Sequence, residues 1–209
     1  MDKPIILIGG GGHCKSVINT IESINREIAG ILDLPVNIGK KCLNYTIVGS
    51  DKDIPKYIDE YEFIITLGYI KNADIRTEIF KKIKLLGGTL ATIIAKSAIV
   101  SRYAKIGEGT VILNQACVNA SAEIGCNCII NTMANIEHDS IVGDGCHIST
   151  GCLINGGVKV GKYSFMGSGS IVCQGLTIAE KTIIGAGGVV CSSIYHSGTY
   201  VGVPVKKIK

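Results

Sequence analysis

The chain has 209 residues, of which 46% are hydrophobic, 5% are aromatic and 27 are glycine, and its formal net charge is +4. This composition excludes a disordered chain, and the length allows one large domain or two small ones. The charge is too small to require a nucleic-acid partner, and no stretch approaches the roughly 20 apolar residues of a membrane span.

The cysteines and the first residues of the chain point to its compartment. Nine cysteines are an odd number, so free thiols packed in a reducing cytosol explain them better than a disulfide framework. Cys126 and Cys128 form a C-x-C pair, which matches neither the C-x-x-C redox spacing nor a usual zinc knuckle, so we expect no metal. The apolar run before the first glycine has only five residues, too short for a signal-peptide core. We therefore expect a cytoplasmic protein.

Strand and helix patterns alternate through the first half of the chain. The expected elements are a strand over residues 4–8, a helix over 13–26, a strand over 28–32, a short helix over 51–57, a strand over 63–67, a helix over 74–86 and a strand over 89–94. Such alternation predicts a small parallel α/β sheet of Rossmann type. We assign this Rossmann-like domain to residues 1–90.

Glycines fill the turn between the first expected strand and the first expected helix. They are Gly9, Gly10, Gly11 and Gly12, followed by His13. Glycines at this place let a phosphate approach backbone N–H groups at the positive end of a helix. The fingerprint G-x-G-x-x-G fails, because its third glycine falls on Cys14 or Lys15, which disfavours an NAD-dependent enzyme.

The glycine turn also departs from the phosphate-loop pattern. Cys14 replaces the second glycine of G-x-x-x-x-G-K-[ST], so a tight turn that binds no ligand stays an alternative. Asp33 ends the second expected strand, where an α/β nucleotide site places a contact to ribose or base. An Asp at that place can also simply start a turn.

The second half carries an aliphatic residue, or methionine, at every sixth position without a slip in register. The seventeen positions are Ile94, Val100, Ile106, Ile112, Val118, Ile124, Ile130, Ile136, Val142, Ile148, Ile154, Val160, Met166, Val172, Ile178, Ile184 and Val190. A period of six fits neither a helix nor an alternating strand, and it predicts a β-solenoid in which three hexads, or 18 residues, complete one coil. Four positions after the aliphatic residue the chain favours small residues, which suit the tight corners of such a prism. We assign residues 91–209 to this parallel β-helix.

The 18-residue coil makes neighbours of residues that are 18 apart in the sequence. His138 and Gly156 meet this condition, so the Gly156 N–H should lie one coil, about 5 Å, from His138. His138 and His147 are nine residues apart, which is half a coil, so they should point in different directions within one subunit. If these two histidines act together, a second subunit must bring them together.

His138 is the candidate general base. It lies two residues past the inward Ile136, which points it outward, and Glu137 and Asp139 flank it. A carboxylate can hold imidazole in one tautomer and raise its basicity, as a base that takes a proton from an attacking amine or hydroxyl requires. The backbone N–H of Gly156 could then stabilise the oxyanion formed when a thioester is attacked. A solvated charge pair without a catalytic role is the alternative.

Motifs in both halves of the chain resemble one enzyme family. The chain opens with GGGGHCKS, its hexads contain NTMANIEHD, CHIST and LINGG, and it ends in YVGVPVKKI. Over essentially its whole length it is similar to the sialic-acid O-acetyltransferase and nucleotide-sugar N-acetyltransferase family of left-handed β-helix enzymes. The most specific elements are I-E-H-D from Ile136 to Asp139, N-G-G at 155–157 and G-x-P from Gly202 to Pro204.

The resemblance implies roles for individual residues. The family's catalytic histidine falls on His138, its acidic partner falls on Asp139, and acetyl-CoA is the co-substrate, with no metal. The other acetyl-CoA contacts fall on His147 near the acetyl group, on the Gly156 N–H at the thioester oxygen, and on Ser168 and Ala186 at the pantetheine. Enzymes of this family are homotrimers with acetyl-CoA in the groove between coils. Their N-terminal domain holds the sugar acceptor, which assigns Gly9 to His13 and Asp33 to that acceptor.

Differences among members of this family bear on which acceptor we expect. Nucleotide-sugar members often carry an Asp-Asp pair after the second strand, whereas Leu34 follows Asp33 here. Sialic-acid O-acetylating members can lack a histidine at the position of His147. The presence of both His13 and His147 favours an N-acetyltransferase acting on a nucleotide-linked amino sugar, such as a UDP-4-amino-4,6-dideoxy sugar. An O-acetyltransferase acting on sialic acid or a related nonulosonic acid is the alternative.

A zinc enzyme and a structural protein are the two alternatives to acetyl transfer. A zinc carbonic anhydrase on this scaffold needs three histidine ligands, and only His138 and His147 lie in the repeats. A structural solenoid without catalysis is the non-enzyme alternative. It would need neither an acid-flanked histidine stacked on a glycine nor a separate α/β domain.

Overall fold

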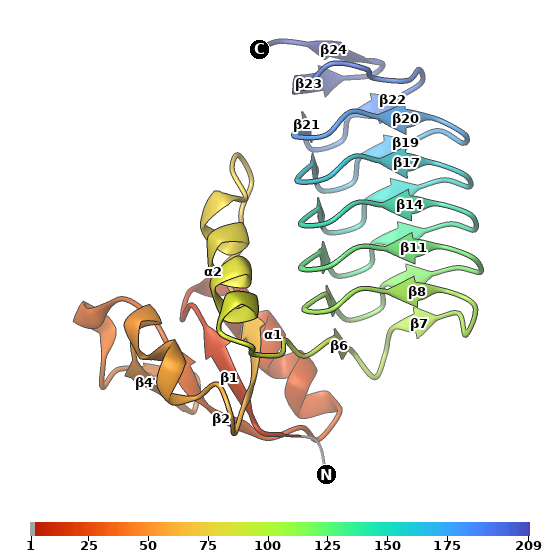
Figure 1. Cartoon of the computed structure of the whole chain (residues 1–209). Coiled ribbons are helices and arrows are strands. Elements are labelled where there is room, and N and C mark those ends of the chain that lie inside the picture. Colours follow the sequence, from red (N-terminus) through yellow and green to blue (C-terminus); the bar gives the residue numbers. More distant parts are fainter. Residues whose placement is uncertain (1–2) are drawn as a thin grey trace.

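A parallel sheet forms the centre of the N-terminal domain in the computed structural model, which describes residues 3–209 (Figure 1). The elements are β1 (Ile5–Ile8), α1 (Gly12–Ser23), β2 (Ile28–Leu32), η1 (Pro35–Asn37), β3 (Lys41–Cys42), β4 (Tyr45–Gly49), η2 (Asp51–Lys56), β5 (Glu62–Ile65) and α2 (Asp74–Leu85). The strand order is β3-β4-β2-β1-β5, with β3 antiparallel to β4 and the other pairs parallel. Residues 1 and 2 of the predicted 1–90 domain lie outside the described part.

The predicted Rossmann-like order of elements is confirmed, with local differences, one of which is that α1 ends at Ser23 instead of residue 26. The hairpin of β3 and β4 is absent from the sequence prediction, because β3 has only two residues and gives no periodic pattern. β5 ends at Ile65 instead of Leu67, where Thr66 turns its hydroxyl to donate to the carbonyls of Ile8 and Gly9. The strand expected over 89–94 is reduced to a bridge at Leu90 and a two-residue strand, because the chain there leaves the sheet for the coil.

The second half of the chain winds into a left-handed β-helix of short strands. They are β6 (Ile93–Ile94), β7 (Ile99–Val100), β8 (Lys105–Ile106), β9 (Val111–Ile112), β10 (Cys117–Val118), β11 (Glu123–Ile124), β12 (Ile129–Ile130), β13 (Asn135–Ile136), β14 (Ile141–Val142), β15 (His147–Ile148), β16 (Leu153–Ile154), β17 (Lys159–Val160), β18 (Phe165–Met166), β19 (Ile171–Val172), β20 (Thr177–Ile178), β21 (Thr182–Ile184), β22 (Val189–Val190), β23 (Gly198–Gly202) and β24 (Val205–Lys207).

These strands form the three faces of a prism. We call the sheet of β6, β9, β12, β15, β18 and β21, extended by β23 and β24, the docked face. The sheet of β7, β10, β13, β16, β19 and β22 is the open face, and the sheet of β8, β11, β14, β17 and β20 is the polar face. Strands one coil apart pair in parallel register, as Asn135 with Leu153 and Ile136 with Ile154 show. The predicted 18-residue coil is therefore confirmed.

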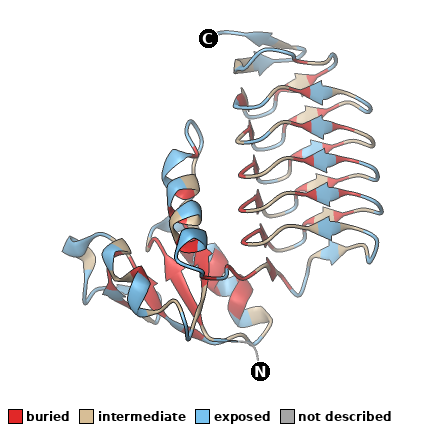
Figure 2. Cartoon of the chain, viewed as in Figure 1, coloured by how far each residue is buried: buried red, intermediate tan, exposed pale blue. Residues whose placement is uncertain are grey.

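The hexad residues form the core of the coil. From Ile112 to Val190 each of them is buried, and the small residues at the corners, such as Ala116, Ala134 and Cys152, are buried with them (Figure 2). The side chains that face outward from the strands decide what each face can contact. All nine cysteines are free, as predicted. Within residues 3–209 no helix is long and apolar enough to cross a membrane.

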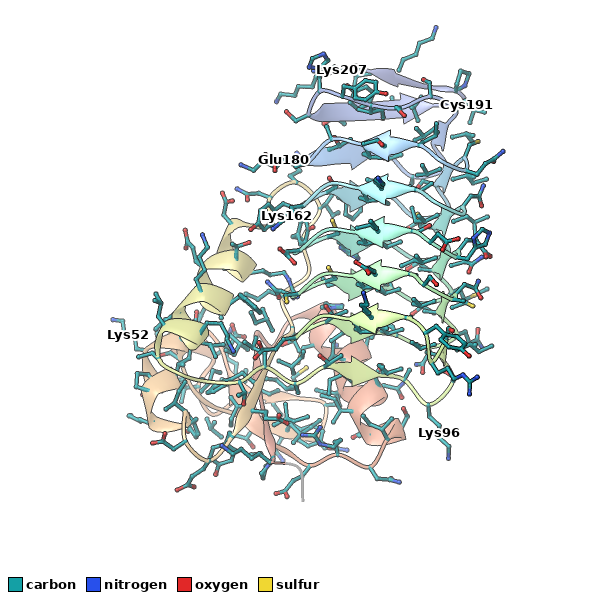
Figure 3. All side chains as sticks on the ribbon, turned by 45° about the vertical axis from the view of Figure 1, so that its right-hand side comes forward. Lys52, Lys96, Lys162, Glu180, Cys191 and Lys207 are labelled. Carbon is teal, nitrogen blue, oxygen red and sulfur yellow. The ribbon has the colours of Figure 1, made fainter. Side chains whose placement is uncertain are left out.

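The N-terminal domain packs against the docked face. Val111 and Ile129, which point outward from that face, share one apolar cluster with Cys14, Val17 and Ile21 of α1. Helix α2 runs beside the coil (Figure 1), and Lys162 marks the coil corner that faces this helix, whereas Cys191 lies on the opposite side (Figure 3). The open face is left uncovered by the chain's own N-terminal domain.

Candidate active site

His138 lies at the corner where the chain turns from β13 on the open face to β14 on the polar face. Asp139 has a φ of 61°, a left-handed conformation that Asp tolerates better than most residues. The His138 Nδ1–H donates to Asp139 Oδ2 at 2.7 Å, since a carboxylate accepts. Nε2 is then the unprotonated nitrogen of a side chain that is 64% exposed. The hydrogen bond that His138 donates to Asp139, and then the charge of Asp139, raise the pKa of His138 above its usual value.

Gly156 lies directly against the His138 ring, as the 18-residue coil predicts. A Cβ placed on Gly156 would come within 2.8 Å of both Cε1 and Nε2 of His138, so only glycine fits beside this ring orientation. The Gly157 N–H donates to the His138 carbonyl at 2.9 Å and ties the two corners together. Within residues 3–209 the Gly156 N–H has no acceptor, which leaves it available to an oxyanion beside Nε2.

Glu137 is held by two asparagines that the sequence prediction missed. Asn119 Nδ2 donates to Glu137 Oε2 at 2.9 Å, and Asn135 Nδ2 donates to Oε1 at 2.8 Å. Both carboxylate oxygens are therefore engaged, which leaves Asp139 as the acid that bonds His138 directly. Asn119 precedes Glu137 by 18 residues, so the coil spacing was a signal that could have found it.

Ser168 and Ala186, the predicted pantetheine contacts, lie at a different corner. They follow β18 and β21, where the chain turns from the docked face to the open face, and both are exposed. The Gly187 N–H donates to the Ser168 carbonyl at 2.9 Å, and the Ser168 hydroxyl lies 3.0 Å from the Ser149 hydroxyl. The predicted stacking of these two residues is confirmed, whereas their contact with pantetheine stays a prediction.

His147 is a buried residue of the docked face. Its Nδ1 lies 2.8 Å from the Tyr69 carbonyl, which only accepts, so Nδ1 carries the proton and Nε2 accepts from Asn131 Nδ2 at 3.1 Å. Burial lowers the pKa of His147 to about 4, and the ring is neutral near pH 7. Half a coil separates it from the corner of His138, as predicted. Its contact with an acetyl group stays a prediction.

His13 brings the glycine loop to His147. The two ring centroids are 6.5 Å apart, and burial, followed by the charge of Arg76, lowers the pKa of His13 to about 3. The buried Nε2 of His13 has no hydrogen-bond partner within residues 3–209. The residues predicted to bind the sugar acceptor therefore lie next to the docked face of the coil, and the neutral rings of His13 and His147 form this contact.

The glycine loop leaves open space at the start of α1. Side-chain atoms added at Gly11 or Gly12 would meet nothing within 4 Å, and both residues are exposed. The first turn of a helix leaves N–H groups without intrahelical acceptors, so an anion can approach here. Gly9 is buried with a φ of 105°, which a glycine adopts without strain, and this turn sets the direction of the loop.

Asp33 binds its own domain with both carboxylate oxygens. Oδ2 accepts from the Gly10 N–H at 3.2 Å and from Asn37 Nδ2 at 3.2 Å, and Oδ1 accepts from the Leu34 N–H at 2.7 Å. A Cβ on Gly10 would lie 2.9 Å from Oδ2, so glycine is needed for this contact. Asp33 thus joins the glycine loop to the turn after β2, and its contact with an acceptor stays a prediction.

The candidate residues occupy both edges of the open face. His138, Asp139 and Gly156 lie at its edge with the polar face, and Ser168 and Ala186 lie at its edge with the docked face. Within one chain these two groups of candidate residues therefore lie at separate corners of the coil. Within residues 3–209 no group of three or more His, Cys, Asp or Glu side chains could hold a metal ion.

Comparison with known proteins connects this geometry to a family. The model of the PglD N-terminal domain family matches residues 4–83. A histidine-to-asparagine variant of perosamine N-acetyltransferase from Caulobacter crescentus, solved with CoA and GDP-perosamine, is 32% identical, with 99% of this chain and 97% of that chain covered and a TM-score of 0.92. Comparison with curated proteins gives no significant match.

A second solved structure agrees with the first. The acetyltransferase domain of PglB from Neisseria gonorrhoeae, in complex with acetyl coenzyme A, is 26% identical, with 100% of both chains covered and a TM-score of 0.90. The similarity to both structures runs through the α/β domain and the coil alike. The chain therefore belongs to the hexapeptide-repeat acetyltransferase family of nucleotide-sugar N-acetyltransferases.

Proposed function

We propose that the protein transfers the acetyl group of acetyl-CoA to the amino group of a nucleotide-linked amino sugar, with His138 as general base. The observation that carries this proposal is the unprotonated Nε2 of His138 beside the free N–H of Gly156. The solved relatives support the substrate class, because one was solved with CoA and GDP-perosamine and another with acetyl coenzyme A. A UDP-4-amino-4,6-dideoxy sugar is a representative acceptor of this class.

In the proposed mechanism the sugar amine attacks the thioester carbonyl directly. Nε2 of His138 takes the proton that the amine loses, and Asp139 stabilises the imidazolium through its bond to Nδ1–H. The Gly156 N–H donates to the oxyanion as the C–N bond forms. When the C–S bond breaks, Nε2 returns the proton to the departing CoA thiolate, so the enzyme regains its starting protonation state.

The test is release of CoA thiol from acetyl-CoA with a panel of acceptors. The panel contains UDP-, dTDP- and GDP-linked 4-amino sugars, together with free and CMP-activated sialic acids. Thiol release with a nucleotide-linked amino sugar, and an acetamide in the product by mass spectrometry, supports the proposal. Release with a sialic acid alone would replace it by O-acetylation, and no release from folded protein with any acceptor would overturn acetyl transfer.

Asp139→Asn is expected to move the acid limb of the pH profile to lower pH. The neutral ring is the active base, so kcat/KM rises with pH through the pKa of His138, which Asp139 raises. Asparagine accepts the φ of 61° at this position but removes the charge, so that pKa falls. We also expect the plateau rate to fall by about tenfold or more, because the ring loses its anionic partner.

Glu137→Gln is the matched control for this prediction. The charge of Glu137 raises the pKa of His138 less than the hydrogen bond and charge of Asp139 do, so Glu137→Gln should shift the acid limb less than Asp139→Asn does. Profiles of kcat/KM between pH 5 and 9, with the pKa of His138 followed by NMR, measure both shifts. A limb at the wild-type position in Asp139→Asn would contradict the assignment of His138 as base.

The complete site is proposed to form between subunits of a homotrimer. His138 lies at one edge of the open face and Ser168 and Ala186 lie at the other, so joining unlike edges of neighbouring copies completes a site. Contacts between unlike surfaces close into a ring rather than a two-fold dimer. The open face also presents apolar side chains, with Ile99 70% and Leu153 37% exposed. The nine free thiols support a reducing compartment such as the cytoplasm.

Leu153→Asp is expected to convert the trimer to monomers and to abolish most of the activity. The substitution puts a charge in the middle of the open face, where its desolvation at an interface is costly. Ile141→Asp is the matched control, because Ile141 is 40% exposed on the polar face. Light scattering gives the mass of each variant, and circular dichroism gives its folding. A trimeric Leu153→Asp variant, or a monomeric wild type with activity, would contradict the shared site.

A further inference from the structure

Arg76 of α2 is a fully buried cation without an acidic partner. Its exposed fraction is 2%, and no carboxylate within residues 3–209 forms an ion pair with it. Burial lowers the pKa of Arg76 to about 10, which still leaves the guanidinium protonated near pH 7. A buried charge is costly unless hydrogen bonds replace its water. The buried Arg76 guanidinium therefore requires hydrogen-bond acceptors from the protein.

Hydrogen-bond acceptors from both domains surround the Arg76 guanidinium. One terminal nitrogen donates to the carbonyls of Ile65 and Leu67, at 2.6 and 2.8 Å, where β5 ends. The other donates to the Asn127 carbonyl at 3.2 Å and to Asn127 Oδ1 at 2.7 Å, in the corner of the coil before β12. Nε has no partner within residues 3–209. The four acceptors surround this cation only when the N-terminal domain sits in this one position on the coil.

The loop that Arg76 holds is the loop that contacts the acceptor half of the site. Leu67 is followed by Gly68, where a Cβ would lie 3.4 Å from the Cβ of His13. The Tyr69 carbonyl accepts from His147, and the Tyr69 hydroxyl donates to the Gly145 carbonyl at 2.5 Å. The segment whose carbonyls accept from Arg76 therefore runs directly into the residues that contact His13 of the glycine loop and His147 of the docked face.

A second contact between α2 and the coil allows comparison. Lys84, two turns further along the helix, pairs with Glu108 at 2.8 Å, and the two side chains are 40% and 33% exposed. Exposed ion pairs contribute little to stability, because water solvates both charges when the pair opens. Water cannot solvate the buried Arg76 guanidinium in this way. The Arg76 contact therefore restricts the position of the N-terminal domain on the coil more than the Lys84 contact does.

We infer that Arg76 is a positioning residue for acetyl transfer: by requiring acceptors from β5 and from Asn127 at once, it fixes the acceptor-binding domain on the coil. This inference rests on the proposed function for its effect on catalysis. An amine held by the N-terminal domain must reach a thioester held by coils, and an error of about 1 Å in such a distance can cost about 10²-fold in rate. Arg76 acts through this distance and touches neither substrate.

Arg76→Gln tests the inference, because a positioning residue should affect kcat much more than it affects the binding of either substrate. Glutamine lacks the charge and the second arm, so it cannot reach both sets of acceptors. We expect kcat to fall by about tenfold or more, while KM for acetyl-CoA and the Kd of the acceptor change by about threefold or less, because the contacts to each ligand remain. Arg76→Lys keeps the charge with a single donor group, and we expect it to recover part of the lost kcat.

Asn127→Gly is the second variant, for use also if Arg76→Gln does not fold. Asn127 has a φ of 54°, which glycine adopts freely, so the change removes Oδ1, and the Nδ2 that donates to the Arg76 carbonyl at 3.4 Å, without straining the backbone. Gln115→Gly is its matched control, because Gln115 has a φ of 59° in a corner that faces solvent. Lys84→Gln is the control for Arg76→Gln. Both controls should keep wild-type kcat, and Asn127→Gly should lose about threefold or more.

Hydrogen exchange separates this inference from the proposed function. Peptides covering residues 65–69 and 125–128 should exchange faster in Asn127→Gly than in Gln115→Gly, whether or not an acceptor is known. If wild-type protein transfers no acetyl group, the proposed function fails, and exchange alone decides whether Arg76 fixes the domains. Wild-type kcat in Arg76→Gln or Asn127→Gly, or unchanged exchange in both segments, would overturn the inference.

Discussion

His138→Ala is expected to lower kcat for acetyl transfer by about 10²-fold or more, which is the usual contribution of a positioned general base. The ring provides the unprotonated Nε2, and alanine offers no group that can take the proton in its place. Because the His138 side chain is 64% exposed and its ring bonds only Asp139, the melting temperature should stay near that of the wild type. Thiol release measures kcat, and calorimetry measures the affinity for acetyl-CoA.

The control for this variant is His196→Ala. His196 is an exposed histidine beyond β22, and its carbonyl accepts from the Tyr200 hydroxyl, a contact that alanine keeps. We expect wild-type kcat and affinity for this variant. A His138→Ala variant that keeps kcat within threefold of the wild type would exclude His138 as the base and would leave it a solvated partner of Asp139.

Gly156→Ala is expected to lower kcat by at least about tenfold through the His138 ring. A Cβ on Gly156 would lie 2.8 Å from Nε2 and from Cε1, a distance that forces the exposed ring to turn away. The added methyl group would also crowd the space in which the Gly156 N–H meets the thioester oxygen. The backbone at Gly156 does not have the positive φ that disfavours alanine, so folding should be retained.

A double variant distinguishes the two effects of Gly156→Ala. In the His138→Ala background there is no ring to displace, so the additional loss measures only crowding at the N–H. An additional loss below about twofold supports an effect through the ring, whereas a full tenfold loss would assign it to the oxyanion donor. Wild-type kcat in Gly156→Ala alone would contradict both roles.

The coil could be predicted from the sequence almost residue by residue. Each hexad places its aliphatic residue inward, so burial of the fourteen hexad positions from Ile112 to Val190 and the pairing of residues 18 apart follow from the repeat alone. The contact of His138 with Gly156 is a consequence of that regularity, as is the separation of His138 from His147. Local geometry is enough here because each coil contacts mainly the coils before and after it.

The N-terminal domain could be predicted less completely. The alternation of strands and helices predicted the sheet, but β3 has only two residues, which is too short for the β3–β4 hairpin to show a periodic pattern. Asp33 was expected at the end of β2, and its bonds to Gly10 and Asn37 depend on how two loops meet. A charged residue within an amphipathic helix is normally solvated, so nothing in the sequence marks Arg76 as buried.

The sequence by itself determined the β-helix, the stacking of His138 on Gly156 and the half-coil separation of His138 from His147. Only the tertiary structure decided that His147 is a buried, neutral residue between the domains and that Arg76 and Asn127 join β5 to the coil. The physical reason is that repeat contacts have a constant sequence separation, whereas a contact between domains is set by which buried charges and carbonyls can satisfy one another. The regular half of the chain therefore places His138, and the irregular contact between domains places His13 and the glycine loop beside the coil.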